Sequence, residues 1–291
     1  MVDAASTLQI STFTGDVTFA DGADIITASA GTSNVRVGVN AGNSITSGGN
    51  YNVVVGDEAG TALTTGDNNV AIGYAALDLE DTGTDSVAIG YNALTAQNND
   101  AANYNVAVGS SAGAAVTSGT NNTLIGGLAG DAISTGAGNT GLGKNALGAT
   151  TTASANTAVG TNAMLSNTEG ANNVAVGHQA LDSDTLGSKT VAVGKNTLQS
   201  QNFTTATDNF NVAVGYDAGQ AVTTGVHNTL IGASAGDALT AGGSNTVLGR
   251  DALSADTKGS RAVAIGEAAL QAQNFTTATE NNNVAVGYAA G

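Results

Sequence analysis

The side chains best suited to chemistry are acidic residues that stand in pairs, such as Asp57-Glu58 and Asp182 with Asp184. Two carboxyl groups flanking a glycosidic bond are the catalytic groups of most glycoside hydrolases. Adjacent residues of a strand point to opposite faces, so Asp57 and Glu58 would not act together. Neither pair recurs beside aromatic residues able to hold a sugar, and the chain has no Trp. We therefore predict no catalytic residues and place a polysaccharide-degrading enzyme last among three classes of function.

Other groups able to bind metals or act as nucleophiles are few. The two histidines, His178 and His227, occupy positions that hold Tyr, Ser, Lys or Asn in other copies of an internal repeat, so both are predicted to be solvated. Without Cys, the chain has no disulfide, thiolate metal site or Cys nucleophile. The calcium-binding pattern Gly-Gly-x-Gly-x-Asp is absent, and Thr fills no complete column as an ice-binding surface requires. We expect no metal and no cofactor.

The composition excludes several partners and classes. The net charge of −16 repels phosphate, which argues against nucleic acid and against an anionic membrane surface. No stretch of 18 apolar residues exists, so membrane insertion is not expected. With 41% hydrophobic and only 10% charged residues the chain is not disordered, and without Pro it is not collagen-like.

The elements that must position these side chains belong to a repeat. A five-residue phrase ending in Gly occurs 15 times, for example at 69–73 and 122–126, and ten of the 14 intervals between these glycines are 17 residues. The phrase alternates with period two, as a strand does, and its Gly provides the turn that follows. A 17-residue unit holding two short strands cannot bury its own apolar side, so the units must stack.

The phrase also predicts which side chains form the core. Its second residue is Val or Thr and its fourth is Val, Ile or Leu, and we expect both to point inward. The third residue, Ala in nine of 15 copies, is expected to face outward as a column of small apolar residues that contacts another surface. The first is Asn in 12 copies, which fits either an amide ladder between coils or a turn preference.

The second half of the repeat divides the copies into two classes. Four residues after the phrase Gly stands either a large apolar residue or a second Gly. Copies with the second Gly place an aliphatic residue three positions later, where the other copies are always polar. Each coil is thus predicted to have one aliphatic slot, because two residues would overpack it and none would leave a cavity. The slot residues are Leu77, Leu94, Leu147, Met164, Leu181, Leu198, Leu253 and Leu270 in one class and Ile45, Leu63, Val116, Ile133, Val222 and Leu239 in the other.

These features predict an all-β chain, a parallel β-solenoid or β-roll of about 15 coils with a 17-residue repeat. Frequent Gly, Val, Thr and Asn disfavour helices, and about 4.8 Å per coil gives a rod roughly 70 Å long. The array is expected to span 34–291 and to continue or dock beyond Gly291, since a solenoid end needs a cap. Residues 1–33 are expected to form a β-rich connector or cap, with strands at 7–11 and 17–19.

The phrase Asn-Val-Ala-Val-Gly-x-x-Ala resembles the head repeats of trimeric autotransporter adhesins of the YadA type. It is still more similar to repeats of phage tail fibres, and the resemblance covers residues 34–291. It implies a left-handed parallel β-roll and a homotrimer. The sequence shows a 17-residue period rather than the shorter adhesin repeat, and no coiled-coil stalk, membrane anchor or signal peptide. We therefore expect a phage structural protein rather than a bacterial adhesin.

The expected function is structural and not enzymatic. The chain would be a segment of a trimeric phage tail fibre in the virion, acting as a rigid spacer and host-attachment element. The alternative is a trimeric adhesin head on a bacterial cell surface. Expected partners are further copies of the chain, other tail or fibre proteins at the N-terminal end, and a host cell-surface receptor.

Three long coils supply the candidate contact sites. Insertions at 97–104, 201–210 and 273–282 carry most of the aromatic residues that lie outside the phrase and its flanks. Loops on a rigid scaffold commonly carry recognition. The alternative is that these aromatic residues pack against a neighbouring subunit or cap the edge of the roll. The candidate residues are Tyr104, Asn202, Phe203, Phe210, Asn274 and Phe275.

Overall fold

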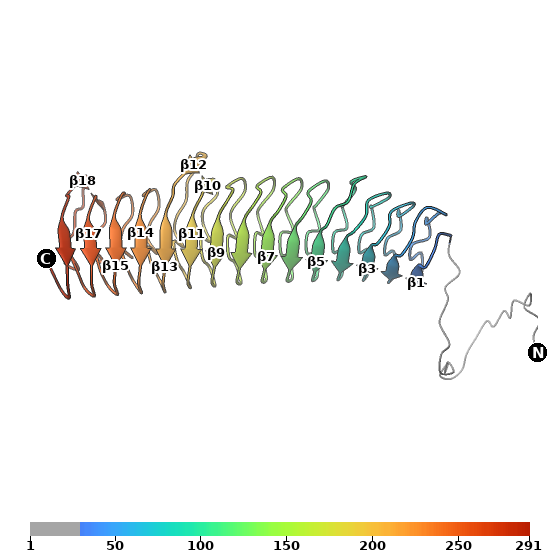
Figure 1. The fold of residues 1–291 in the computed structure, drawn as a ribbon, viewed down its shortest axis with the longest axis horizontal. Helices are drawn as coiled ribbons and strands as arrows, with labels where there is room; N and C mark the ends of the chain where they lie inside the picture. The colour runs from blue at the N-terminus through green and yellow to red at the C-terminus, as the bar shows by residue number, and fades with distance from the viewer. Residues whose placement is uncertain (1–29) are drawn as a thin grey trace, which may run out of the picture.

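The computed structural model describes residues 30–291, which form a rod of stacked coils (Figure 1). Fifteen parallel strands, one from each phrase, make a single sheet along the rod. The described residues contain no helix. The strands of the sheet are β1 Val35–Val37, β2 Val53–Val55, β3 Val70–Ile72, β4 Val87–Ile89, β5 Val106–Val108, β6 Thr123–Ile125, β7 Thr140–Leu142, β8 Thr157–Val159, β9 Val174–Val176, β11 Val191–Val193, β13 Val212–Val214, β14 Thr229–Ile231, β15 Thr246–Leu248, β17 Val263–Ile265 and β19 Val284–Val286.

Each strand pairs in register with the strand of the next coil, so that Ala71 of β3 lies beside Ala88 of β4. The predicted all-β parallel solenoid of about 15 coils and 17-residue period is therefore confirmed. The second strand that we expected in every coil is missing from most coils of the described part. It is present only as the short pairs β10 Gly187–Ser188 with β12 Thr207–Asp208 and β16 Gly259–Ser260 with β18 Thr279–Glu280.

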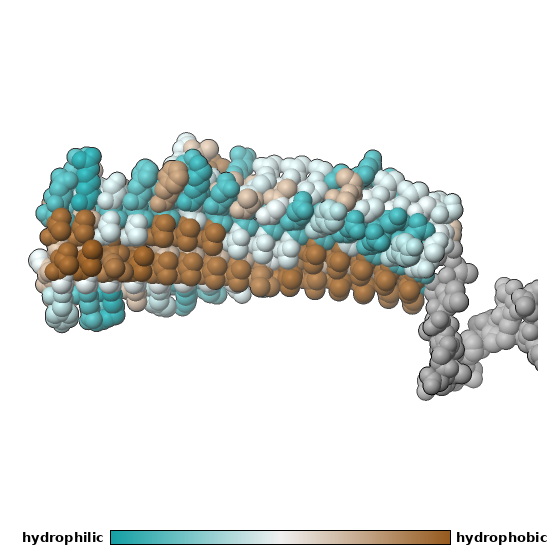
Figure 2. Space-filling view, viewed as in Figure 1, coloured by the Kyte–Doolittle hydropathy of each residue, from teal (hydrophilic) through white to brown (hydrophobic). Residues whose placement is uncertain are grey.

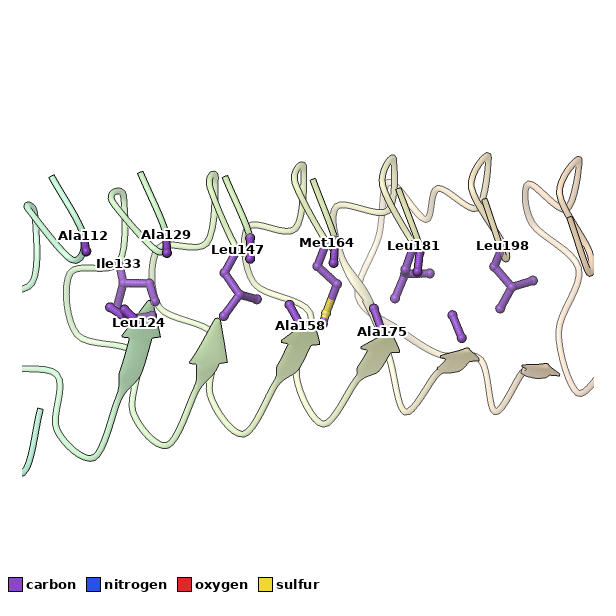
Figure 3. Close-up of a cluster of buried hydrophobic side chains, with 14 of the residues drawn as sticks. Ala112, Leu124, Ala129, Ile133, Leu147, Ala158, Met164, Ala175, Leu181 and Leu198 are labelled. Carbon is purple, nitrogen blue, oxygen red and sulfur yellow. The ribbon is translucent and has the colours of Figure 1, made fainter. Parts of the chain in front are cut away.

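The predicted orientation of the phrase is wrong. The third residue, such as Ala158 or Ala175, is fully buried and points into the coil, as Figure 3 shows. The second and fourth residues lie on the outer face instead. The reason is the thinness of the coil. A Cβ at Gly141, the third residue of the phrase that holds β7, would lie only 3.4 Å from the carbonyl oxygen of Ala146 and from Cδ1 of Leu147, so a small residue fits inside.

The predicted aliphatic slot is confirmed. Ile133 fills the interior of one coil beside Gly130, while Leu147 does so in the next coil, and both are fully buried. The polar Thr150, at the position equivalent to Ile133, is buried as well. A Cβ at Gly130 would lie 2.8 Å from Cδ1 of Ile133. The slot therefore admits one large side chain from either of two positions, as the pattern of classes requires.

A further compensation within the core involves the third residue of the phrase. Leu124 occupies the room left by the glycines of two coils, because a Cβ would lie 2.9 Å from its Cδ1 at Gly113 and 2.6 Å from its Cδ2 at Gly130. Leu230 lies in the same way 2.7 Å from a Cβ at Gly219. Our sequence analysis missed this relation because it placed the third residue outside.

The glycine that ends each phrase is required by backbone geometry. Gly126 has φ 136°, a conformation that L side chains rarely adopt, and its Cβ would lie 2.5 Å from the carbonyl oxygen of Gly143 in the next coil. The residue four positions after the phrase Gly also has positive φ in both classes, 56° at Gly130 and 60° at Leu147. A left-handed Leu costs about 1 kcal/mol, which its complete burial offsets.

The column of phrase Asn residues is a buried ladder between coils. The Oδ1 of Asn122 accepts a hydrogen bond from the backbone N–H of Asn139 at 3.0 Å, and its Nδ2 donates to the carbonyl oxygen of Gly136 at 2.9 Å. Equivalent bonds recur along the rod, for example from Asn173 to Asn156 at 2.9 Å. Of the two interpretations left open above, the ladder is confirmed, although most of its bonds join an amide side chain to main-chain atoms.

The strands predicted at 7–11 and 17–19 lie outside the described residues. Within 30–291, no helix is long and apolar enough to cross a membrane.

Candidate interaction surfaces

An apolar stripe runs along the whole sheet. It consists of the first and last residue of each of the 15 strands, which are the second and fourth residues of the phrases. These side chains are half-buried or exposed, with Ile125 at 37%, Leu142 at 45% and Leu248 at 48% of full exposure. Figure 2 shows the stripe as a continuous apolar band from one end of the rod to the other.

The stripe extends over the full length of the sheet. At about 4.8 Å per strand it is roughly 70 Å long and two side chains wide, with Val, Ile or Leu at the last position of every strand and Val or Thr at the first. Patches of more than a few hundred Å² mark interaction sites. Aromatic residues follow the phrase Gly in some coils and are exposed, with the rings of Tyr74 and Tyr91 stacked at 5.6 Å. The stripe is therefore a candidate protein interface.

The three inserted loops share a support made of a carboxylate, a Gln and an Asn, which is buried at 97–104 and 201–210 and partly exposed at 273–282. In the loop at 201–210, Gln201 donates through Nε2 to Asp184 at 2.6 Å and accepts through Oε1 from Asn211 at 2.9 Å. In the loop at 273–282, Gln273 contacts Asp256 and Asn283 in the same way, at 2.6 Å and 2.6 Å.

The loop at 97–104 has the same support with a longer acid. Gln97 donates to Glu80 at 2.9 Å and accepts from Asn105 at 2.8 Å. Asn103 also donates to Glu80 at 3.2 Å. Burial raises the pKa of the Glu80 carboxyl, although the hydrogen bonds from Gln97 and from the backbone of Gly83 oppose the shift.

The sequence carried a signal for this support that we did not use. Each acid is followed 17 residues later by Gln, and the phrase in the repeat of that Gln lacks Asn at its first position, which is Ser86, Thr190 or Ala262. The Asn ladder is thus interrupted in the coil that carries each insertion. Gln97 bonds to the hydroxyl of Ser86 at 2.8 Å, and Gln201 to that of Thr190 at 3.2 Å. An acid, a Gln and a missing Asn therefore mark where a coil is extended.

The candidate contact residues differ in exposure. Tyr104 and Phe210 are exposed, at 58% and 48%. Phe203 is buried at 6%, and its equivalent Phe275 is half-buried. The structure does not bring the six together into one site, because they belong to three loops separated along the rod. The remaining two are Asn202, which is half-buried and accepts from Thr185 at 3.0 Å, and Asn274, which is exposed and accepts from Thr257 at 3.3 Å.

The other residues considered for chemistry do not form a common site. His178 and His227 are exposed, as predicted, and His227 stacks on Phe210 at 5.7 Å between ring centroids. Asp184 is taken up by the loop support, while Asp182 is half-buried. Within 30–291, no three His, Cys, Asp or Glu side chains gather in a way that could hold a metal ion.

Asp184→Ala is expected to loosen the loop at 201–210. Asp184 accepts a hydrogen bond from the backbone N–H of Phe203 at 3.1 Å, and that amide loses its acceptor in the variant. Since a hydrogen bond to a charged group contributes about 1.5–3 kcal/mol, amide exchange at Phe203 should become about 10- to 100-fold faster. Hydrogen exchange read by mass spectrometry measures this. Exchange at Phe275 serves as the control, and equal acceleration at both residues contradicts the assignment.

Mild acid is expected to stabilise the rod through Asp182 and Asp237. Burial raises the pKa of both carboxyls above the ordinary 3.8, and one Oδ1 of each is buried without a hydrogen-bond partner in the described structure. A carboxyl with a higher pKa when folded favours folding at low pH, and this stability is lost as the pH rises through the folded-state pKa. The free energy of unfolding should rise as the pH falls from neutral through the raised folded-state pKa values toward the ordinary 3.8.

The double variant Asp182→Asn with Asp237→Asn should show a weaker rise than the parent chain when urea unfolding is followed at several pH values. Asp57→Asn, at an exposed carboxyl, provides the matched control. Identical slopes for the double variant and the parent chain would show that these two carboxyls do not cause the effect.

Comparisons with known proteins identify no relative of the chain. No protein-family model matches the chain, and no curated protein and no solved structure is significantly similar to it.

Proposed function

We propose that this chain is a self-associating structural protein, a segment of a homotrimeric phage tail fibre. Three left-handed β-rolls would lie side by side along a common axis and form a rigid spacer that contributes to host attachment in the virion. Other fibre proteins would join at the N-terminal end.

The observation that carries this proposal is the apolar stripe. A Val, Ile or Leu side chain ends each of the 15 strands on one face, and Val or Thr begins it, so one copy alone leaves a long, partly exposed apolar stripe facing water. A face that is apolar over the full length of a rod fits a partner of the same length. A second copy of the chain provides such a partner, and the resemblance of the phrase to trimeric fibres favours three copies.

The rest of the molecule supports a structural rather than a catalytic role. The interior is filled by small residues and large aliphatic residues, and the phrase Asn side chains within it bond to backbone atoms between coils. Such an interior fits a rigid rod.

Light scattering on the purified chain at micromolar concentration tests the assembly. We expect three times the chain mass of 28.1 kDa. A particle of one chain mass would contradict the proposal. Antibody labelling of the native protein tests its place: signal on purified phage particles supports the fibre, while signal on the bacterial envelope would favour the adhesin head instead.

A further inference from the structure

We propose that the inserted loops at 201–210 and 273–282 are two equivalent binding sites for a neutral, repeating polysaccharide. This inference rests on the proposed role in host attachment and names the chemistry of the ligand. It starts from the fact that residues 201–207 and 273–279 have the same sequence, Gln-Asn-Phe-Thr-Thr-Ala-Thr. The segments that follow, 211–216 and 283–288, are identical as well, while Leu186 corresponds to Lys258 and Phe210 to Asn282.

The two loops are held in the same conformation by the same contacts. The backbone N–H of Phe203 donates to Asp184 at 3.1 Å, and that of Phe275 donates to Asp256 at 3.0 Å. The loop carbonyl oxygens at Phe203 and Phe275 each accept a hydroxyl hydrogen bond at 2.9 Å, from Thr185 and Thr257 respectively. The protein thus builds one loop shape twice.

An ion pair lies at the equivalent place beside each loop, but both of its residues differ between the two loops. Lys189 pairs with Asp208 at 2.6 Å, and Arg261 pairs with Glu280 at 2.8 Å. Because each charge is neutralised by its neighbour, these pairs stabilise the loop without presenting a net charge to a ligand. What the two loops share is therefore their shape and their uncharged tips.

The chemistry of the tips points to a neutral polar ligand. Thr204, Thr205 and Ala206 are exposed, as are Thr276, Thr277 and Ala278 in the second loop. These residues offer hydroxyl groups that both donate and accept hydrogen bonds, next to methyl groups. The net charge of −16 opposes an anionic ligand. A neutral sugar carries hydroxyl groups on an apolar ring, so it can both exchange hydrogen bonds with the Thr hydroxyl groups and contact the methyl groups.

The spacing of the tips points to a polymer. The strands that follow the loops, β13 and β19, are four steps apart in the sheet, which is about 19 Å along the rod. Both loops project at the same edge of the rod, where Figure 1 marks β12 and β18. A small molecule cannot reach both tips, whereas a chain with a repeating unit can engage both at once. Two weak sites joined in this way bind far more tightly than one.

Binding to neutral polysaccharides tests the inference. Surface plasmon resonance would compare immobilised dextran, mannan and galactan with anionic alginate, and short oligosaccharides of each would be titrated by calorimetry. We expect the full chain to bind at least one neutral polymer. Thr204→Ala with Thr205→Ala, and separately Thr276→Ala with Thr277→Ala, should each weaken that binding by about 100-fold and to the same extent. Each pair should also halve the number of oligosaccharide sites.

Asn98→Ala, an exposed position in the third inserted loop, is the matched control and should leave binding unchanged. Failure of all three neutral polymers, preference for alginate, or unequal effects of the two Thr pairs would overturn the inference. These experiments distinguish a failure of the loop sites from a failure of the proposed function. A trimer that binds none of these polymers refutes only the loop sites, while a monomer that binds them refutes the fibre assembly.

Discussion

Ile125→Asp is expected to dissociate the assembly into single chains that remain folded. Ile125 lies on the apolar stripe near the middle of the rod and points away from the core of its own coil. In the assembly it would face the equivalent residue of each other copy. An unpaired carboxylate buried in such an interface costs about 3–5 kcal/mol, which corresponds to self-association weakened by more than 100-fold.

Sedimentation velocity over a range of concentrations measures this effect, and circular dichroism checks that the coils persist. Thr135→Asp adds the same charge to an exposed position of the same coil, away from the stripe, and should leave the assembly intact. An Ile125→Asp chain that still sediments as the parent assembly would show that the stripe is not the interface. Equal dissociation by Thr135→Asp would point to a general effect of charge.

Gly130→Leu is expected to be strongly destabilising on its own, and two compensating changes should rescue it. The added side chain would meet Leu124 and Ile133, whose Cδ2 and Cδ1 atoms lie 2.6 Å and 2.8 Å from a Cβ at this position. Overpacking together with left-handed Leu strain costs about 3 kcal/mol. Adding Ile133→Asn and Leu124→Ala converts the coil to the other class and should bring stability to within about 1 kcal/mol of the parent chain.

The rescue follows from the neighbouring coils. Asn167, at the position equivalent to Ile133, is buried and donates through Nδ2 to the carbonyl oxygen of Gly170 at 2.9 Å, so an Asn at 133 has a matching acceptor in Gly136. Leu124→Ala alone should cost about 3 kcal/mol through the cavity it leaves. Guanidinium unfolding of the parent chain, the three single variants and the triple variant measures the coupling. If the triple variant loses as much stability as the separate changes together, the single slot is disproved.

The sequence was sufficient to predict the solenoid architecture because the same pattern occurs in each of the 15 repeats. Fifteen phrases fix the period, and the alternation of classes at Gly130 and Leu147 fixes the slot, which burial confirms. The number of coils, the parallel stacking and the absence of helix among the described residues followed from these regularities. Local pattern was informative here since every coil repeats the environment of its neighbours.

The orientation of the phrase was not predictable by the rule that larger side chains point inward. Ala175 is buried and Val174 is half-buried on the outside, because the coil is too thin to hold two columns of Val. A face that would be core in a compact domain is left as surface in a single coil. The alternation of Val and Ala has the same period in either orientation, so period alone cannot distinguish them.

The support beneath the inserted loops escaped prediction for a different reason. Asp184 and Gln201 lie 17 residues apart, and their contact arises only when adjacent coils stack in register. Each residue by itself looks like an ordinary polar position on a surface. Side chains that meet between coils can be read from sequence only after the stacking register is known.

The Asn ladder bears on how such a rod changes its length during evolution. Each amide bonds to main-chain atoms of the following coil, as Asn122 does to the N–H of Asn139 and the carbonyl oxygen of Gly136. Since those atoms are the same in any residue, this ladder makes few demands on the identity of the next coil, whereas a core residue such as Leu124 needs the glycine of the preceding coil. Gene segments encoding coils of matching class can therefore be gained or lost by recombination, and each event changes the reach of the rod by about 4.8 Å per coil without disturbing the ladder.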